Sequence, residues 1–196
     1  MELLRSSPLY YLPAVVLTGI FFCHSCAGQA NCDSISWSSS RPLTWNDFKG
    51  APDTNSRIGA LSYISFKYKL EREKKKIRLL TLTYFQPSIS WVDSSSTGSL
   101  SLGHEQTHFN IDELIRRSFV RQLLSIPFEE ERLIRNIQHQ YFLASLSRQL
   151  MHNSYDLDTD YHRNEMQQKL WNEKLLQLLK EKESYSFTMH EWHVDD

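Results

Sequence analysis

Two histidines that flank a glutamate form the part of the sequence with the clearest chemical meaning. His104 and His108 stand four residues apart, and Glu105 directly follows the first of them, in the pattern HExxH. On a helix, residues four apart share one face, so both imidazoles can reach one metal ion. Glu105 falls about 100° further round the helix, where it can accept a proton from a water molecule that zinc activates. The motif therefore predicts a hydrolytic zinc site.

A structural role for the two histidines is the alternative. Mostly apolar residues recur around them at three- and four-residue spacing, which predicts a helix with one buried face. Imidazoles on such a face can be core residues, but two of them in successive turns need several hydrogen-bond partners. We therefore favour metal ligation. The stripe consists of Leu100, His104, His108, Ile111, Ile115 and Phe119.

A catalytic zinc ion needs a third protein ligand and one open coordination position. No His or Glu follows His108 at the short spacing that the metzincin motif requires. Asp112 lies four residues beyond His108, on the same predicted face. We favour a role in which it accepts an imidazole N–H rather than binds the metal. The downstream candidates for the third ligand are His139, His152, Asp156, Asp160, Tyr161, His162 and Glu165.

A hairpin is predicted upstream of the motif. Residues 60–70 alternate aromatic or aliphatic with polar side chains, which is typical of a half-buried strand. Residues 77–91 form a second β-branched and aromatic run, interrupted near Pro87, and the charged segment 71–76 indicates a turn between the two. The second strand is expected to offer an edge on which an extended substrate can pair.

Three helices are predicted after the hairpin. The first begins at Leu100 and ends before Pro127, the second covers 128–151 and the third covers 160–182, with a break at 153–159. Because strands precede helices in separate blocks, we expect an α+β domain, in which a small antiparallel sheet is followed by a three-helix bundle. The candidate core residues of the second and third helices are Leu133, Ile137, Phe142, Leu146, Leu150, Met166, Leu170, Leu175 and Leu178.

The N-terminus is predicted to be a signal peptide. Arg5 precedes an apolar run at 9–23, which is shorter than the roughly 20 residues of a spanning helix. Small residues follow, so we expect cleavage to remove residues 1–30 and leave one domain at 31–196, secreted or periplasmic. An uncleaved anchor is the alternative, and Cys26 is a candidate lipid anchor that would make the protein a membrane-attached lipoprotein.

Length and charge exclude several classes of protein. The chain has 196 residues, which suits one ordinary domain and excludes a large multidomain enzyme. Lys and Arg number 22 and Asp and Glu number 23, so the formal net charge is −1. A near-neutral chain lacks the basic surface that nucleic-acid binding requires. Function is therefore expected to reside in a local site.

Several separated motifs resemble the DUF922 family of predicted secreted zinc-dependent proteases. The sequence HEQTHFNI begins at His104 and is similar to the family's HEQxHFDI-like helix. YDLDTDYH begins at Tyr155 and resembles the family's YDxxTxH segment, which a QxxW pattern follows, here at 168–171. WNDFKG from Trp45 is similar to the family's opening motif. The resemblance covers about 45–171, most of the predicted mature chain.

The resemblance departs from the family's pattern at one position. Counted from Tyr155, the family's downstream His corresponds to Tyr161, whereas this chain has His162 one residue later. Inside a regular helix, that shift turns the side chain about 100° away from the site. Next to a helix start, a local change in backbone conformation can compensate for the one-residue shift. We predict His162 as the third ligand and keep Tyr161 and Asp160 as alternatives.

The resemblance implies a zinc-dependent protease acting on a peptide or protein substrate. Zn²⁺ would be held by the two motif histidines and His162, and Glu105 would act as general base and then as proton donor. Tyr155 or Tyr161 would donate a hydrogen bond to the developing oxyanion. A metal-dependent amidase shares this attack chemistry, so the residues do not separate it from an endopeptidase.

A non-catalytic function is the alternative reading of the same residues. The chain would then be a secreted binding or structural module whose zinc only links the helices. A site closed by four protein ligands would be structural, whereas a catalytic site keeps one position open. Asp160 or Asp112 would supply the fourth ligand in the closed site.

Overall fold

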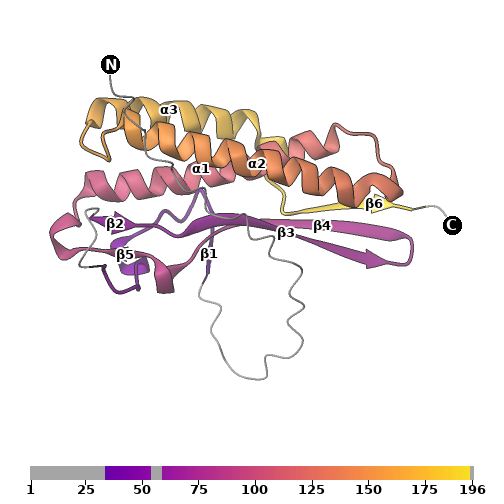
Figure 1. Cartoon of the computed structure of the whole chain (residues 1–196), viewed down its shortest axis with the longest axis horizontal. Helices are drawn as coiled ribbons and strands as arrows, with labels where there is room; N and C mark the ends of the chain where they lie inside the picture. The colour runs from indigo at the N-terminus through magenta and orange to yellow at the C-terminus, as the bar shows by residue number, and fades with distance from the viewer. Residues whose placement is uncertain (1–33, 54–58, 195–196) are drawn as a thin grey trace, which may run out of the picture. The chain divides into compact units, whose positions relative to one another are not determined.

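The computed structural model describes residues 34–53 and 59–194, and Figure 1 shows their arrangement. Its longest strands are β3 (Ile64–Glu73) and β4 (Lys76–Phe85), which pair antiparallel along their whole length and confirm the predicted hairpin. Alternate residues of β4 are buried, as expected for a strand with one face against a core. The strand ends before Pro87, which cannot donate to a ladder and begins a short 3₁₀ turn instead.

Two segments far apart in sequence complete the main sheet. β1 (Ile35–Ser36) pairs with the end of β4, and β6 (Met189–His193) pairs with its beginning. β4 therefore has neighbours on both sides, and the expectation that 77–91 offers a free edge is wrong for this strand. A separate two-stranded sheet joins β2 (Ala60–Leu61) to β5 (Trp91–Val92).

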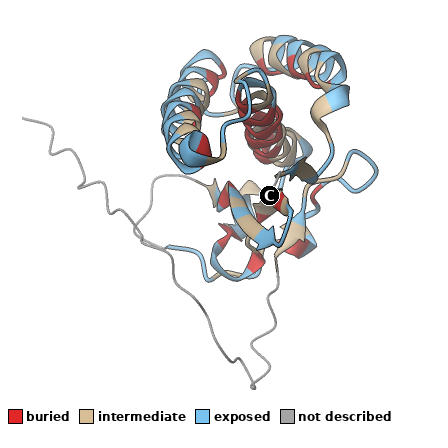
Figure 2. Cartoon of the chain, turned by 90° about the vertical axis from the view of Figure 1, so that its right-hand side faces the viewer, coloured by how far each residue is buried: buried red, intermediate tan, exposed pale blue. Residues whose placement is uncertain are grey.

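The helices are α1 (Ser99–Leu124), α2 (Glu130–Asp158) and α3 (Glu165–Glu181). They lie on one face of the main sheet, and α1 contacts β3, β4 and both other helices. Buried residues concentrate in α1, the central helix of Figure 2. The α+β class, with a small antiparallel sheet and three helices, is thus confirmed. No helix of the described residues has the length and apolar character needed to cross a lipid bilayer.

The second helix is longer than predicted. α2 continues to Asp158, so the break expected at 153–159 is wrong. Tyr155 is fully buried there, and the packing of this ring outweighs the weak helix propensity of the Asn, Ser and Asp residues around it. The third helix begins at Glu165 rather than at 160, because residues 160–162 have positive φ and cannot continue a right-handed helix.

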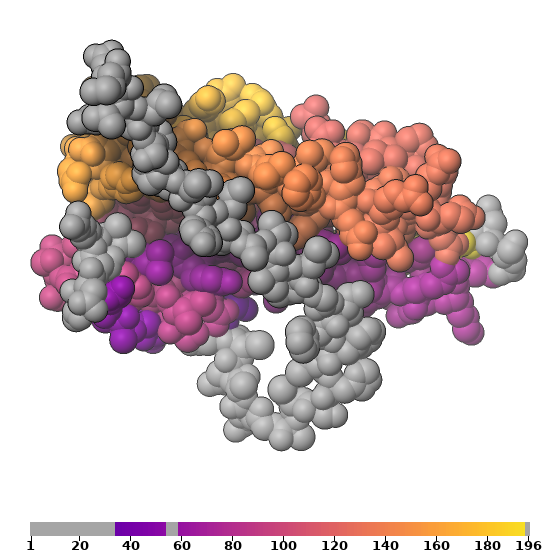
Figure 3. Space-filling model, viewed as in Figure 1, coloured from indigo at the N-terminus to yellow at the C-terminus, as the bar shows by residue number. Residues whose placement is uncertain are grey.

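Several predicted core residues are exposed instead. α2 buries the face that contains Leu133, Ile137, Ala144 and Tyr155, and Figure 3 shows that much of the helix lies at the surface. Residues on its other face therefore meet solvent, and the same holds at the start of α3. The exposed residues are Phe142, Leu146, Leu150, Met166 and Leu170. The predicted signal segment 1–30, with Cys26, lies outside the described residues.

Candidate metal centre

The second and third turns of α1 carry the HExxH residues. His104 and Glu105 are buried, and His108 is half-buried, one turn further along the same face. The ring of His104 stacks on that of Tyr155, with centroids 4.6 Å apart and planes at 21°. Packing therefore fixes the orientation of His104 before any ligand binds.

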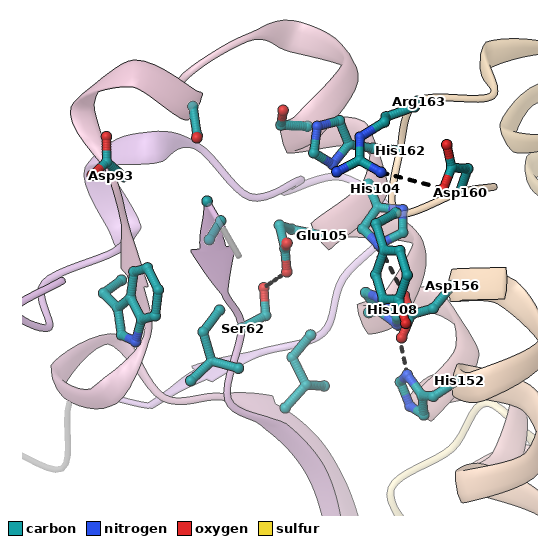
Figure 4. A pocket seen from close by; sticks show the side chains of 18 of the residues that line it. Ser62, Asp93, His104, Glu105, His108, His152, Asp156, Asp160, His162 and Arg163 are labelled. Atoms are coloured by element: carbon teal, nitrogen blue, oxygen red, sulfur yellow. Dashed lines mark hydrogen bonds and ion pairs between the residues drawn. The ribbon is translucent and has the colours of Figure 1, made fainter. Parts of the chain in front are cut away.

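Three side chains of the types that can bind a metal ion converge at this face. Nε2 of His104 lies 3.1 Å from Oδ1 of Asp156, in the last turn of α2, and Nε2 of His108 lies 3.0 Å from the same oxygen. The two Nε2 atoms are 3.1 Å apart. Among the described residues, these three form the group whose donor atoms lie within 4.8 Å of one another. Figure 4 shows Asp156 beside the two imidazoles.

The size of this triangle fits a small cation. Donors about 2.0–2.1 Å from a tetrahedral zinc ion are roughly 3.3 Å from each other, close to the separations seen here. Burial acts to raise the pKa of Asp156, but the adjoining imidazoles of His104 and His108 outweigh it and hold the pKa well below its ordinary value. The carboxylate is therefore ionised and available as an anionic ligand.

Two facing stripes of polar residues build the centre. Along α1 the stripe is His104, His108 and Asp112, and along α2 it is Arg148, His152 and Asp156, each at four-residue spacing. The contacts pair the start of one stripe with the end of the other, so the two helices run antiparallel. The stripe on α2 is the sequence signal that singles out His152 and Asp156 from the seven downstream candidates, and the HExxH motif itself does not contain this signal.

The second stripe continues the hydrogen bonding behind His108. Nδ1 of His108 lies 2.7 Å from Nδ1 of His152, and Nε2 of His152 lies 2.9 Å from Oδ1 of Asp112. Arg148 Nε donates to that same oxygen at 2.6 Å. Burial lowers the pKa of His152. By contrast, Nδ1 of His104 is buried and has no partner among the described residues.

The turn after α2 carries the predicted third ligand. Asp160, Tyr161 and His162 have φ of 46°, 51° and 71°, three successive residues in the left-handed region. This turn brings His162 to the pocket wall, with its ring centroid 5.9 Å from that of His104. Burial lowers the pKa of His162. The structure thus brings His162 beside the centre, while Asp156 supplies the donor atom nearest to both motif histidines.

The two predicted oxyanion donors lie in different surroundings. Tyr155 is fully buried behind His104, its hydroxyl has no partner among the described residues, and it is not part of the pocket lining. Burial raises the pKa of its hydroxyl far above the ordinary value. Tyr161 is about half exposed and lines the pocket. The structure therefore brings Tyr161, and not the Tyr155 hydroxyl, to the pocket.

A pocket of about 880 Å³ opens beside the three donor atoms. Glu105 lines it, and the hydroxyl of Ser62 donates to Oε2 of Glu105. Figure 4 shows Glu105 between Ser62 and His104, with His162 and Arg163 on the adjacent wall. Sequence reasoning missed Ser62, which lies 43 residues before Glu105 and has no pattern of its own.

Comparison with known proteins identifies no relative of this chain. No protein-family model matches it, and neither a curated protein nor a solved structure matches it. What the site can do therefore follows from its own side chains. The similarity to the DUF922 motifs stays a prediction from the sequence.

Proposed function

We propose that this protein is a zinc-dependent peptide hydrolase of the zincin type, with the HExxH helix α1 at its centre. The observation that carries the proposal is the convergence of His104, His108 and Asp156 beside Glu105 at one pocket. A bound zinc ion supplies Lewis-acid chemistry, because it lowers the pKa of water toward 7 and polarises a carbonyl. The donor set of two imidazoles and one carboxylate is of the kind that binds zinc.

Asp156 is the third ligand in this proposal. Its Oδ1 is equally close to both Nε2 atoms, whereas His162 contacts the ring of His104 from the side. Three donors, rather than four, leave one coordination position, which is the arrangement of catalytic zinc sites. The pocket lies against all three residues, so a substrate in it would lie beside the proposed metal position.

Glu105 acts as the general base. It lines the pocket next to the ligands, and Ser62 holds Oε2, which leaves Oε1 to take a proton from the attacking water. The same carboxyl group then donates that proton to the leaving amine. Tyr161 and His162 are the donors on the pocket wall that can stabilise negative charge on the substrate oxygen.

An extended peptide fits the pocket through β2. Residues 59–62 line the pocket, and among the described residues β2 has one strand neighbour, β5. The backbone N–H of Asp93 donates to the carbonyl oxygen of Gly59, so the backbone polar groups of Gly59 face β5. Because this orientation alternates along a strand, the N–H and C=O of Ala60 point away from β5. Backbone groups on a strand edge of this kind can pair with an added strand.

The test is zinc-dependent cleavage of a mixed peptide library by the purified protein, followed by mass spectrometry. We expect Glu105→Gln to retain zinc and to lose hydrolysis by about 100-fold or more, because general acid–base catalysis contributes about 10²–10⁴-fold. Glu131→Gln, an exposed change of the same type in α2, is the matched control and should cleave as the wild type does. Full activity in Glu105→Gln would contradict the proposed mechanism.

A further inference from the structure

The hydrogen-bonded chain behind His108 carries a further inference, which rests on the proposed metal centre. Asp112 is fully buried, and its Oδ1 contacts both Arg148 Nε and His152 Nε2. His152 Nδ1 in turn contacts His108 Nδ1 at 2.7 Å. The chain thus runs from a buried carboxylate, through one imidazole, to the outer nitrogen of a proposed ligand.

The protons in this chain can be assigned from its ends. Oδ1 of Asp112 already accepts from Arg148 Nε, which can only donate, so this oxygen is an acceptor and His152 donates to it from Nε2. A neutral imidazole has one ring proton, which leaves Nδ1 of His152 as an acceptor. The short contact to His108 then needs the proton of His108 on Nδ1. His108 is left with a lone pair on Nε2.

That lone pair points at the proposed metal position. Nε2 of His108 lies 3.0 Å from the Asp156 oxygen and 3.1 Å from Nε2 of His104. Two acceptors so close together repel each other unless a cation, or a donor such as the Nε2–H of His104, lies between them. If His108 carried its proton on Nε2 instead, it would donate to Asp156, and the proton would occupy the direction that a metal needs.

We propose that Asp112 and His152 are positioning residues that hold His108 in the Nδ1–H tautomer, which can bind zinc through Nε2. Arg148 fixes the far end of the chain, because its Nη2 also donates to the carbonyl oxygen of Ile64 in β3, at 2.5 Å. This series of hydrogen bonds therefore links His108 to the sheet. His104 has no comparable chain among the described residues and relies on the Tyr155 ring.

Zinc affinity is the first test, measured by competition with a chromogenic chelator. His152→Phe keeps a ring but removes both nitrogens, and we expect its dissociation constant for zinc to rise about 10–100-fold, the usual effect of losing such a partner. His152→Asn, whose amide oxygen can accept from His108 Nδ1, should recover part of the loss. His139→Phe, at an exposed position of α2, is the matched control and should bind as the wild type does.

The tautomer is the second test, and it needs no metal. Nitrogen-15 NMR of the metal-free protein should show the His108 proton on Nδ1 in the wild type and on Nε2 in a large share of His152→Phe. A wild-type His108 protonated on Nε2, or an unchanged zinc affinity in His152→Phe, would overturn the positioning role. A wild type that binds no zinc would overturn the proposed function instead, and the NMR result would still decide the role of His152.

Discussion

At the scale of single residues, the proposed metal centre depends most on the carboxylate of Asp156. This carboxylate touches both motif histidines, and these contacts lower its pKa despite its burial. His162 lies on the opposite side of His104, on a turn with positive φ. We therefore propose separable roles for the two side chains, with Asp156 on the metal and His162 on the substrate.

Substitution of each residue separates these roles. We expect Asp156→Ala to weaken zinc binding by more than about 100-fold, since loss of a partner that only orients a ligand already costs up to about that much. His162→Ala should keep the zinc affinity and slow hydrolysis. Both affinities are measured by chelator competition. The reverse pattern would make His162 the ligand, as the sequence motif predicts.

The candidate site was only partly predictable from the sequence, and spacing explains why. His104, Glu105 and His108 lie within one helical turn, so local periodicity is enough to bring them together. Asp156 lies 52 residues from His104 and reaches it only because α2 continues past 153. Ser62 comes from a segment between strands that no local pattern links to the helix.

At the scale of elements, α1 is anchored by a buried ionic network. Glu113 accepts hydrogen bonds from Arg116 and Arg117 and from Thr83 of β4, and all four residues are buried. The network joins the helix to the sheet directly after the stripe of His104, His108 and Asp112. Removing Glu113 would leave Arg116 buried without its carboxylate and would leave Arg117 with the exposed Glu183 as its carboxylate partner.

Glu113→Ala should therefore be strongly destabilising. We expect its free energy of unfolding to fall by about 3–5 kcal/mol, the usual effect of removing one partner of a buried ion pair. Glu183→Ala removes the exposed partner of Arg117 and should cost less than about 1 kcal/mol. Urea titration followed by circular dichroism measures both. Equal losses in the two variants would contradict the view that burial decides the effect.

The left-handed turn at 160–162 stores strain next to the pocket. A non-glycine residue in this region costs about 1–2 kcal/mol of folding free energy. Glycine avoids that cost, but its greater freedom in the unfolded chain destabilises the folded protein by roughly 0.5–1 kcal/mol. Tyr161→Gly should therefore raise the free energy of unfolding by about 0.5–1 kcal/mol while slowing hydrolysis. Lys74→Gly, at φ 41° in the β3–β4 turn, should give the same stabilisation without the loss of activity. Destabilisation in both variants would show that the turns are not strained.

The packing of Tyr155 explains why the predicted helix break at 153–159 is wrong. The polar residues at 153–159 have weak helix propensity, so the sequence favours a break there. Packing of Tyr155 against the rings of His104 and Trp171 keeps that segment helical, and the chain leaves α2 only at Thr159. Tertiary packing of this kind cannot be deduced from local propensity.

At the scale of the whole molecule, β6 lies near the end of the described residues and completes the main sheet by pairing with β4. Its Glu191 accepts hydrogen bonds from Lys76 and Arg78 of β4, at 2.7 and 2.9 Å. The class of the fold could be predicted, because blocks of strand and helix periodicity show in the sequence. The pairing of 189–193 with β4 could not, because it joins residues more than 100 positions apart and the segment has no distinctive pattern.

Glu191 gives this closure a dependence on pH. The hydrogen bonds from Lys76 and Arg78 lower its pKa from 4.5 to about 2. A lowered carboxyl pKa contributes stability that is present above the unfolded value and is lost as the pH falls through the folded value. Between about pH 5 and pH 2, the thermal midpoint of the wild type should fall more steeply than that of Glu191→Gln. Glu173→Gln, an exposed control in α3, should follow the wild type, and identical slopes in all three proteins would contradict the role of Glu191.

The zinc content of the purified protein tests the central claim most directly. Elemental mass spectrometry after mild dialysis gives the ratio of zinc to chain, and the wild type and Asp156→Ala are measured side by side. Because His104, His108 and Asp156 form one site, we predict a ratio of about one for the wild type and a ratio close to zero for Asp156→Ala. A wild-type ratio close to zero, with zinc present throughout purification, would contradict a metal centre and leave the three side chains as a hydrogen-bonded cluster between α1 and α2.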